Sequence, residues 1–258
     1  MAMNVNLGFV EQMIDIAKRA GEEIMAIYKT DFEVVSKADD SPVTLADQKA
    51  EAVILKAIRE EVTDQIPIMA EEEVAAGRMP DVGQGPFFLV DPLDGTKQFV
   101  SKRGEFTVNI ALIENGEPIF GVVHAPAINA TYWGSRNGAF AETDGAKPRP
   151  IGVRKPGREG VVAVVSRSHR TSEVDDFLKD YKVKEEISSG SSIKFCLVAT
   201  GRADIYPRMG RTMEWDTAAG HAVLKFAGGS VTRVDGTPLT YGKPGHDNPH
   251  FVAKGDFS

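Results

Sequence analysis

Two stretches near the start of the chain repeat apolar residues at the spacing of one helix face. In the first, apolar residues recur at three- and four-residue steps from Val10 to Tyr28, with charged residues between them. In the second, the apolar face runs from Ala46 to Ile58 and follows Thr44, whose hydroxyl can cap a helix start. This period predicts two amphipathic helices at the beginning of the fold.

From Phe87 onward the pattern changes to short apolar runs separated by turn signals. Asn115-Gly116 and Asn137-Gly138 each lie between two such runs, which is typical of β-hairpins. The expected strands are residues 67–70, 87–90, 107–113, 119–124, 130–134 and 139–142. We therefore predict a largely antiparallel sheet, with residues 73–85 as an exposed loop because of their glycine and proline content.

Beyond the proline- and glycine-rich residues 147–160, expected strands and helices alternate. The strands are 161–165, 186–188, the residues after 204 and 230–234, and the helices are 173–181, a helix from Ser191, and 217–226. Such alternation favours an α/β arrangement. A length of 258 residues corresponds to between one and two domains of about 150 residues. We divide the chain into an N-terminal α+β part, residues 1–150, and a C-terminal α/β part, residues 151–258.

Composition narrows the class of partner and the compartment. Thirty basic and 37 acidic residues give a net charge of −7, the wrong sign for binding polymeric nucleic acid. A single cysteine, Cys196, excludes an intrachain disulfide and suits a reducing compartment. Neither a signal-peptide pattern nor a transmembrane segment is evident. We expect a cytoplasmic protein, and a peripheral contact with the inner membrane stays open.

A pair of carboxylates follows the apolar run 87–90. Asp91 and Asp94 are three residues apart, and Pro92 and Gly95 favour a turn there. In such a turn both side chains and a main-chain carbonyl can converge, which supplies the oxygen ligands that magnesium requires. An isolated pair with this spacing is more often a surface turn that caps the next helix.

Three further acidic residues lie where a strand or loop meets a helix start. Glu71 follows the short strand 67–70, Asp47 falls in the first turn of the second helix, and Asp216 precedes the last helix. Each alone also fits helix capping or a solvated loop. Their shared position is therefore informative only when the residues are taken together.

Candidates for binding the rest of a substrate lie in the second part of the chain. Ser191 begins a predicted helix with Lys194 one turn further on, a geometry that suits an anion. His169 follows the strand 161–165, and Arg208, at the end of a strand, can bind a phosphate through two hydrogen bonds. The alternatives are a serine cap with an exposed lysine, a solvated histidine and a surface arginine.

Taken together, the motifs that contain these acidic residues closely resemble those of the inositol monophosphatase superfamily of magnesium-dependent, lithium-sensitive phosphatases. The resemblance spans nearly the whole chain and rests on Pro42-Val43-Thr44-x-x-Asp47, Glu71, Asp91-Pro92-Leu93-Asp94-Gly95-Thr96 and Trp215-Asp216. It implies an α/β (α+β) fold, a layered αβαβα sandwich of the sugar phosphatase type. It also implies a cofactor of two or three Mg²⁺ ions.

The resemblance gives each of these residues an expected role. Asp47, Thr96 and Glu71 would be catalytic, with Asp47 and Thr96 orienting the attacking water. The magnesium ligands would be Glu71, Asp91, the carbonyl of Leu93, Asp94 and Asp216. Gly95, Thr96 and Asp216 would also contact the substrate.

Residues 104–112, 166–169, 190–196 and 215–221 further resemble the bacterial 3'(2'),5'-bisphosphate nucleotidases of that superfamily. These nucleotidases act in sulfate assimilation, where they remove the 3'-phosphate of adenosine 3',5'-bisphosphate (PAP) to give AMP and phosphate. Phosphoadenylyl sulfate (PAPS) is a related substrate. On this basis Ser191, Lys194 and Arg208 would hold the 5'-phosphate and nearby ribose, and His169 would lie near the adenine.

Two other functions stay open at the level of sequence. An inositol monophosphatase would use the same acids with a pocket for a polyol, and a sensor would bind magnesium and nucleotide without turnover. Ser191 and Lys194 favour a doubly phosphorylated small-molecule substrate, whereas Asp47 and Thr96 favour turnover. The choice between a monomer and a homodimer also stays open.

Overall fold

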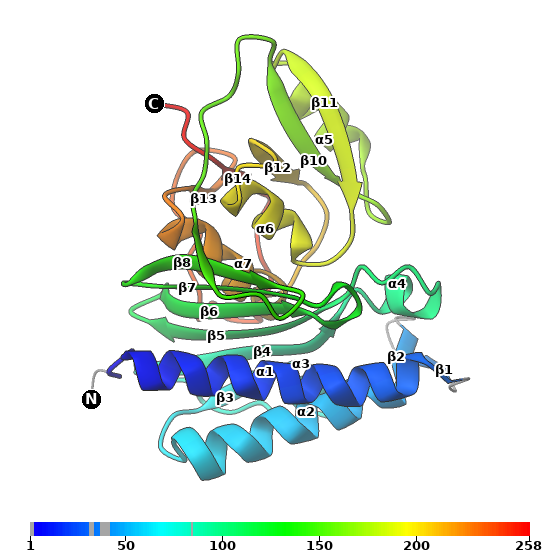
Figure 1. Cartoon of the computed structure of the whole chain (residues 1–258), viewed down its shortest axis with the longest axis vertical. Helices are drawn as coiled ribbons and strands as arrows, with labels where there is room; N and C mark the ends of the chain where they lie inside the picture. Colours follow the sequence, from blue (N-terminus) through cyan, green and yellow to red (C-terminus); the bar gives the residue numbers. More distant parts are fainter. Residues whose placement is uncertain (1–2, 31–33, 37–41, 84) are drawn as a thin grey trace.

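Helices and sheets alternate in layers through the molecule (Figure 1). The computed structural model describes residues 3–30, 34–36, 42–83 and 85–258. Two long helices cover a seven-stranded sheet, two further helices separate that sheet from a five-stranded sheet, and a short helix packs on the second sheet's outer face. This arrangement confirms the αβαβα sandwich that the resemblance implied.

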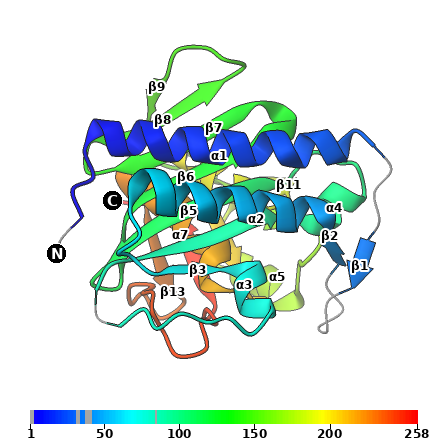
Figure 2. The ribbon, with the colours of Figure 1, turned by 90° about the horizontal axis from the view of Figure 1, so that it is seen from below.

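The first part of the chain supplies the long helices and the larger sheet. α1 (Leu7–Tyr28) and α2 (Leu45–Ala57) lie side by side across one face of the sheet (Figure 2). The strand order is β3-β4-β5-β6-β7-β8-β9, with β3 and β4 parallel and the other neighbours antiparallel. The strands are β3 (Ile68–Ala70), β4 (Phe87–Asp94), β5 (Thr107–Glu114), β6 (Glu117–Ala125), β7 (Ala130–Ser135), β8 (Gly138–Thr143) and β9 (Arg149–Ile151).

Short elements join these strands and helices. They are the antiparallel pair β1 (Val34–Ser36) and β2 (Pro42–Thr44), a π-helical turn (Ile58–Val62), α3 (Glu71–Ala75), α4 (Thr96–Val100) and a 3₁₀ turn (Pro126–Ile128). α2 begins directly after Thr44, but the cap predicted there involves a side chain outside the described ones.

The second part of the chain supplies the smaller sheet and the remaining helices. The strand order is β11-β10-β12-β14-β13, with β11, β10 and β12 parallel and β14 antiparallel to both neighbours. The elements are β10 (Val161–Ser166), α5 (Ser172–Leu178), β11 (Val183–Ser189), α6 (Ile193–Ala199), β12 (Ile205–Arg208), α7 (Glu214–Phe226), β13 (Ser230–Arg233) and β14 (Phe251–Lys254). Among the described residues, no helix combines the length and apolar character needed to cross a membrane.

The hydrophobic core explains why the layers stack in this way. Met13, Ile16 and Ile24 of α1 have no exposed surface and belong to one cluster with apolar residues of β4, β5 and β6. A second cluster joins the opposite face of the same sheet to α6, α7 and the second sheet. The large sheet is therefore buried on both faces, which accounts for its long apolar strands.

Several predicted boundaries are wrong. α3 occupies residues 71–75 at the start of the loop predicted at 73–85, and β14 was not predicted at all. α5 ends at Leu178, and the helix predicted from Ser191 begins at Ile193. The last helix begins at Glu214 and not at 217, so Asp216 lies inside its first turn.

Candidate active site

One cavity of about 240 Å³ collects residues from both parts of the chain. Every residue proposed from the sequence as a metal ligand or substrate contact lines it. They are Glu71, Asp91, Leu93, Asp94, Gly95, Thr96, His169, Ser191, Lys194, Arg208 and Asp216. The walls come from the ends of β4, β10 and β12 and from the starts of α3, α4, α6 and α7, so seven separate elements must meet to form the site.

Sheet register brings Glu71 and Asp91 together. β3 and β4 are parallel neighbours in which Ala70 pairs with Val90, so the next residue on each strand emerges at the same level. Glu71 is the first residue of α3 and Asp91 lies within β4. The carboxylate just beyond the end of β3 and the one within β4 are thereby placed side by side.

A β-bulge brings Asp94 to the same side of β4 as Asp91. Residues three apart on a regular strand face opposite sides of the sheet. Here Asp91 pairs with Asn109 and Asp94 with Thr107, so three steps along β4 match only two along β5. The extra residue at Pro92-Leu93 turns both carboxylates toward the cavity. The turn predicted directly after residue 90 is therefore wrong, because the strand continues to Asp94 and the chain turns at Gly95.

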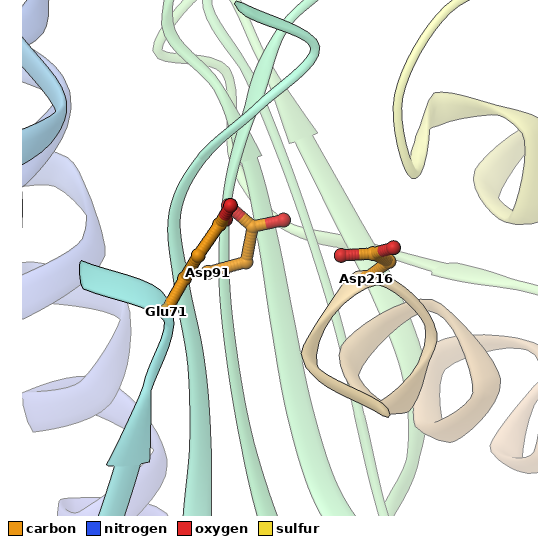
Figure 3. A group of neighbouring side chains, drawn as sticks. All are labelled: Glu71, Asp91 and Asp216. Atoms are coloured by element: carbon orange, nitrogen blue, oxygen red, sulfur yellow. The ribbon is translucent and has the colours of Figure 1, made fainter. Parts of the chain in front are cut away.

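Asp216 completes the acidic cluster from the opposite wall. Carboxylate oxygens of Glu71, Asp91 and Asp216 lie within 4.8 Å of one another. In Figure 3 the Asp216 side chain projects from the first turn of α7 toward the other two. Its Oδ2 accepts a hydrogen bond of 2.8 Å from the backbone N–H of Met213, which fixes the side chain at the helix start.

The carboxylates raise one another's pKa. Burial raises the pKa of Asp91 well above its ordinary value, and the charges of Glu71, Asp94 and Asp216 raise it further. Burial likewise raises the pKa of Asp216, with Asp94 and Glu71 adding to the effect. For Asp94, burial raises the pKa while Lys194 opposes the change. Such a cluster is costly to ionise unless a cation neutralises it.

The donor set fits a hard divalent cation. The converging groups are carboxylate oxygens, and the residue Leu93 between the two aspartates also lines the cavity. Oxygen ligands without sulfur or imidazole are the set that magnesium and similar ions prefer. The acidic part of the cavity can therefore hold a metal ion.

Asp47 and Thr96 occupy different positions relative to the cavity. Thr96 is the first residue of α4 and lines the cavity. Asp47 lies in the first turn of α2, as predicted, and is only 1% exposed. It is not among the lining residues, but its charge also contributes to the raised pKa of Asp91.

The cavity also has a basic part, formed by Lys194 and Arg208. Lys194 and Arg208, 6% and 7% exposed, are buried and not solvated as the alternatives supposed. Burial lowers the pKa of Lys194 to about 8, although Asp94 counteracts it. The Nε of Arg208 is buried and lacks a hydrogen-bond partner among the described residues. Desolvation lowers the pKa of the rim residue His169 to about 4, and the nearby positive charges of Arg208, Lys97 and Lys194 contribute to this shift. Its ring is therefore neutral near pH 7.

The Ser191 segment differs from a simple helix start. Ser191 has a φ of +46°, which is uncommon for a residue with a side chain, and α6 begins two residues later. The Lys194 ammonium donates a hydrogen bond back to the carbonyl of Ser191. Ser191 and Lys194 are thus held together, but by a tight turn and not by consecutive helical residues.

Sequence reasoning missed the residues that support the site. Asn109 Nδ2 donates to Ser192 Oγ at 3.1 Å, and Ser192 Oγ donates to the carbonyl of Asp216 at 2.9 Å. These two hydrogen bonds join β5, the start of α6 and the start of α7. The only signal was a buried asparagine within an apolar strand. Lys97 and Arg211 were also missed, although both line the cavity.

Comparisons with known proteins extend over nearly the whole chain. Residues 8–252 match the inositol monophosphatase family. The chain is 45% identical over 234 residues to the 3'(2'),5'-bisphosphate nucleotidase CysQ of Escherichia coli K12, covering 90% of this chain and 93% of that protein. Its structure is similar to that of CysQ from Bacteroides thetaiotaomicron, with a TM-score of 0.83, 37% identity and coverage of 99% and 100%. It is also similar to an IMPase of Thermotoga maritima, with a TM-score of 0.79, 26% identity and coverage of 96% and 92%.

Proposed function

Because the chain belongs to the inositol monophosphatase family, we propose that it is a magnesium-dependent 3'(2'),5'-bisphosphate nucleotidase. It removes the 3'-phosphate of adenosine 3',5'-bisphosphate and releases AMP and phosphate, in the context of sulfate assimilation. Phosphoadenylyl sulfate is a related substrate and lithium an inhibitor. The relatives named as CysQ nucleotidases, at 40 to 46% identity over most of the chain, support this assignment.

The observation that carries the proposal is that one cavity holds both an acidic cluster and two buried basic residues. The acidic cluster suits a metal-bound reacting phosphate, whereas the buried Lys194 and Arg208 suit a second phosphate that does not react. Neither basic side chain forms an ion pair with a carboxylate of the described residues, so both cations are available to an anion. A polyol ring carrying a single phosphate would leave this basic part without a partner.

In this proposal the acidic residues hold magnesium. Glu71, Asp91, Asp94, Asp216 and the carbonyl of Leu93 are the ligands, for two or three ions. When bound, magnesium neutralises the phosphoryl oxygens and lowers the pKa of the attacking water. The fit rests on the oxygen-only donor set and on the mutual repulsion of carboxylates that a cation would relieve.

The remaining residues orient the reactants. Thr96 and Asp47 position the attacking water, since a threonine hydroxyl can pass a proton from water to a nearby carboxylate. Gly95 and Thr96 contact the reacting phosphate, whereas Ser191, Lys194 and Arg208 hold the 5'-phosphate and nearby ribose. His169, which is neutral at pH 7, lies at the adenine. Holding both phosphates fixes the ester bond relative to the water, which is the main requirement of phosphoryl transfer.

The sequence supports the rest of the proposal. The partner is a small nucleotide and not a nucleic acid polymer, given the net charge of −7. The single cysteine suits a cytoplasmic location. The protein is a monomer or a homodimer.

The decisive experiment compares two substrates. Phosphate release from adenosine 3',5'-bisphosphate and from inositol 1-phosphate is measured side by side with Mg²⁺, after chelation with EDTA, and with added lithium. We expect a kcat/KM at least about 100-fold higher for the bisphosphate and no turnover in EDTA. Preference for inositol phosphate would discard the roles of Ser191, Lys194 and Arg208. Turnover of neither substrate would favour a sensor.

Asp94→Asn tests the metal ligands. The substitution removes one charge at the acidic cluster but keeps the shape of the side chain, so we expect the fold to remain and kcat to fall by about 100-fold or more. Far-ultraviolet circular dichroism controls for folding. Near-normal hydrolysis by this variant would refute the metal assignment.

A further inference from the structure

Glu105 contacts two of the segments that line the cavity, yet it has no part in the proposed chemistry. It belongs to the sequence motif 104–112 and directly precedes Phe106 and β5. It does not line the cavity. Its contacts nevertheless reach both the metal-binding turn, residues 91–96, and the substrate loop, residues 189–191.

The side chain of Glu105 forms hydrogen bonds with the second part of the chain. Its two carboxylate oxygens accept hydrogen bonds of 2.7 and 2.8 Å from Nε and Nη2 of Arg167, and Oε2 also accepts one of 3.0 Å from the backbone N–H of Gly190. Arg167 in turn donates to the carbonyl of Ser188. A two-point arginine contact of this kind fixes orientation as well as distance.

The backbone carbonyl of Glu105 packs closely against two glycines, Gly95 and Gly190. A Cβ added at Gly95 or at Gly190 would lie 2.9 Å from the Glu105 carbonyl oxygen, so each position requires glycine. Gly95 ends the metal-binding turn and Gly190 lies in the substrate loop. Both segments therefore pack against the same peptide group. Nearby, Gln98 Nε2 donates a hydrogen bond of 2.7 Å to Ser168 Oγ, next to His169.

We propose that Glu105 is a positioning residue that sets the distance between the two phosphate sites. This inference rests on the proposed function, since it assumes that one substrate spans the acidic and basic parts of the cavity. The Arg167 and Gly190 contacts hold Ser191, in its left-handed conformation, against the turn that carries Asp94. A small displacement of either end would misalign the ester bond, which lowers the rate steeply.

Charge and position predict opposite results for Glu105→Gln. The Glu105 carboxylate is close enough to Lys194 for their charges to interact. On charge alone, removing this carboxylate would strengthen binding of a second phosphate. As a positioning residue, Glu105 would weaken it when replaced, because neutral glutamine cannot keep both strong contacts with Arg167.

The experiment measures kcat/KM for adenosine 3',5'-bisphosphate and for adenosine 3'-monophosphate, which lacks the second phosphate. We expect Glu105→Gln to lower the ratio of the two values by about tenfold or more, with a smaller change for the monophosphate. Gly190→Ala should lower the same ratio, because its Cβ would press on Gln98 and on the Glu105 carbonyl. Thermal unfolding of each variant shows whether it is folded.

Glu186→Gln is the matched control. Glu186, in β11, forms a two-point contact with Arg170, at 2.6 and 3.2 Å, and neither residue lines the cavity, so the ratio should stay unchanged. An unchanged or higher ratio in Glu105→Gln would overturn the inference, as would equal losses for both substrates. If the unaltered protein hydrolyses neither nucleotide, it is the proposed function that fails.

Discussion

Lys194 is a buried ammonium whose only described hydrogen-bond acceptor is the carbonyl of Ser191. Such a group is left with donors to spare, which an anionic oxygen can take up. We expect Lys194→Ala to raise KM for adenosine 3',5'-bisphosphate by about 10- to 100-fold, with a much smaller effect on adenosine 3'-monophosphate. Steady-state kinetics with both substrates measures the difference. Equal effects on the two would remove Lys194 from the second phosphate site.

Glu51 makes the stability of the fold depend on pH. Its side chain is 4% exposed and accepts a hydrogen bond of 2.8 Å from the backbone N–H of Glu72, next to the metal ligand Glu71. Burial raises the pKa of Glu51 to about 7 from an ordinary value of 4.5. The folded protein therefore holds this proton more tightly than the unfolded chain. The stabilisation is complete below pH 4.5 and is lost as the pH rises through 7.

Glu51→Gln should remove this dependence while keeping an acceptor for the Glu72 N–H. Relative to the unaltered protein, we expect the variant to gain roughly 2–3 kcal/mol in free energy of unfolding between pH 5 and pH 8. Urea unfolding in EDTA at both pH values measures the gain without metal. A difference between the two proteins that is constant with pH would show that Glu51 does not titrate in this range.

At the scale of elements, the start of α7 is held by an irregular segment, residues 239–248. The buried carboxylate of Glu214 accepts hydrogen bonds from the backbone N–H groups of Gly242 and Lys243, from Lys243 Nζ at 2.6 Å, and from His246 Nδ1 at 2.9 Å. Asn248 Nδ2 donates to the carbonyl of Met213 at 2.7 Å. Met213, whose backbone N–H fixes the Asp216 side chain, is therefore itself held by a hydrogen bond from this segment.

Glu214→Ala should therefore affect both stability and the acidic cluster. Removing one partner of a buried pair costs about 3–5 kcal/mol, because the other charge stays desolvated. We also expect the Mg²⁺ concentration for half-maximal activity to rise about tenfold, as Asp216 loses its support. Val223→Ala, on the same helix but far from its start, is the control for lost stability. A similar magnesium shift in both variants would contradict the positioning of Asp216.

Sequence patterns predicted the long elements and failed at the irregular ones for physical reasons. α1 and the hairpins carry periods that persist over many residues, so their packing agrees with local preference. The bulge at Pro92-Leu93 depends on pairing with β5, a partner far along the chain, and no local period reports it. Likewise, the acidic residues were found through their motif, whereas Asn109 and Glu105 act through contacts that only the fold brings together.

At the scale of the whole molecule, α7 links the two parts of the chain. It follows β12 in sequence but packs on β5, β6 and β7 of the first sheet. A Cβ at Gly121 would lie 2.6 Å from the carbonyl oxygen of Ala219, and one at Gly134 2.7 Å from that of Ala222. These glycines let the helix backbone lie directly on the sheet. The position of Asp216 relative to Asp91 therefore depends on contact between residues from both sides of position 150.

We expect two fragments made by cutting the chain after β9, residues 1–151 and 152–258, not to fold when produced separately. Without α7, the first part would expose the face of β5 to β7 that now belongs to the second hydrophobic cluster, and α7 in turn would lose its support. Thermal unfolding of each fragment should show no cooperative transition. Co-expression of both fragments is the control. It should restore a cooperative unfolding transition, because the interface between the fragments is then complete. A cooperative transition in fragment 1–151 alone, near the melting temperature of the intact chain, would make it an independent domain and α7 an accessory to its core.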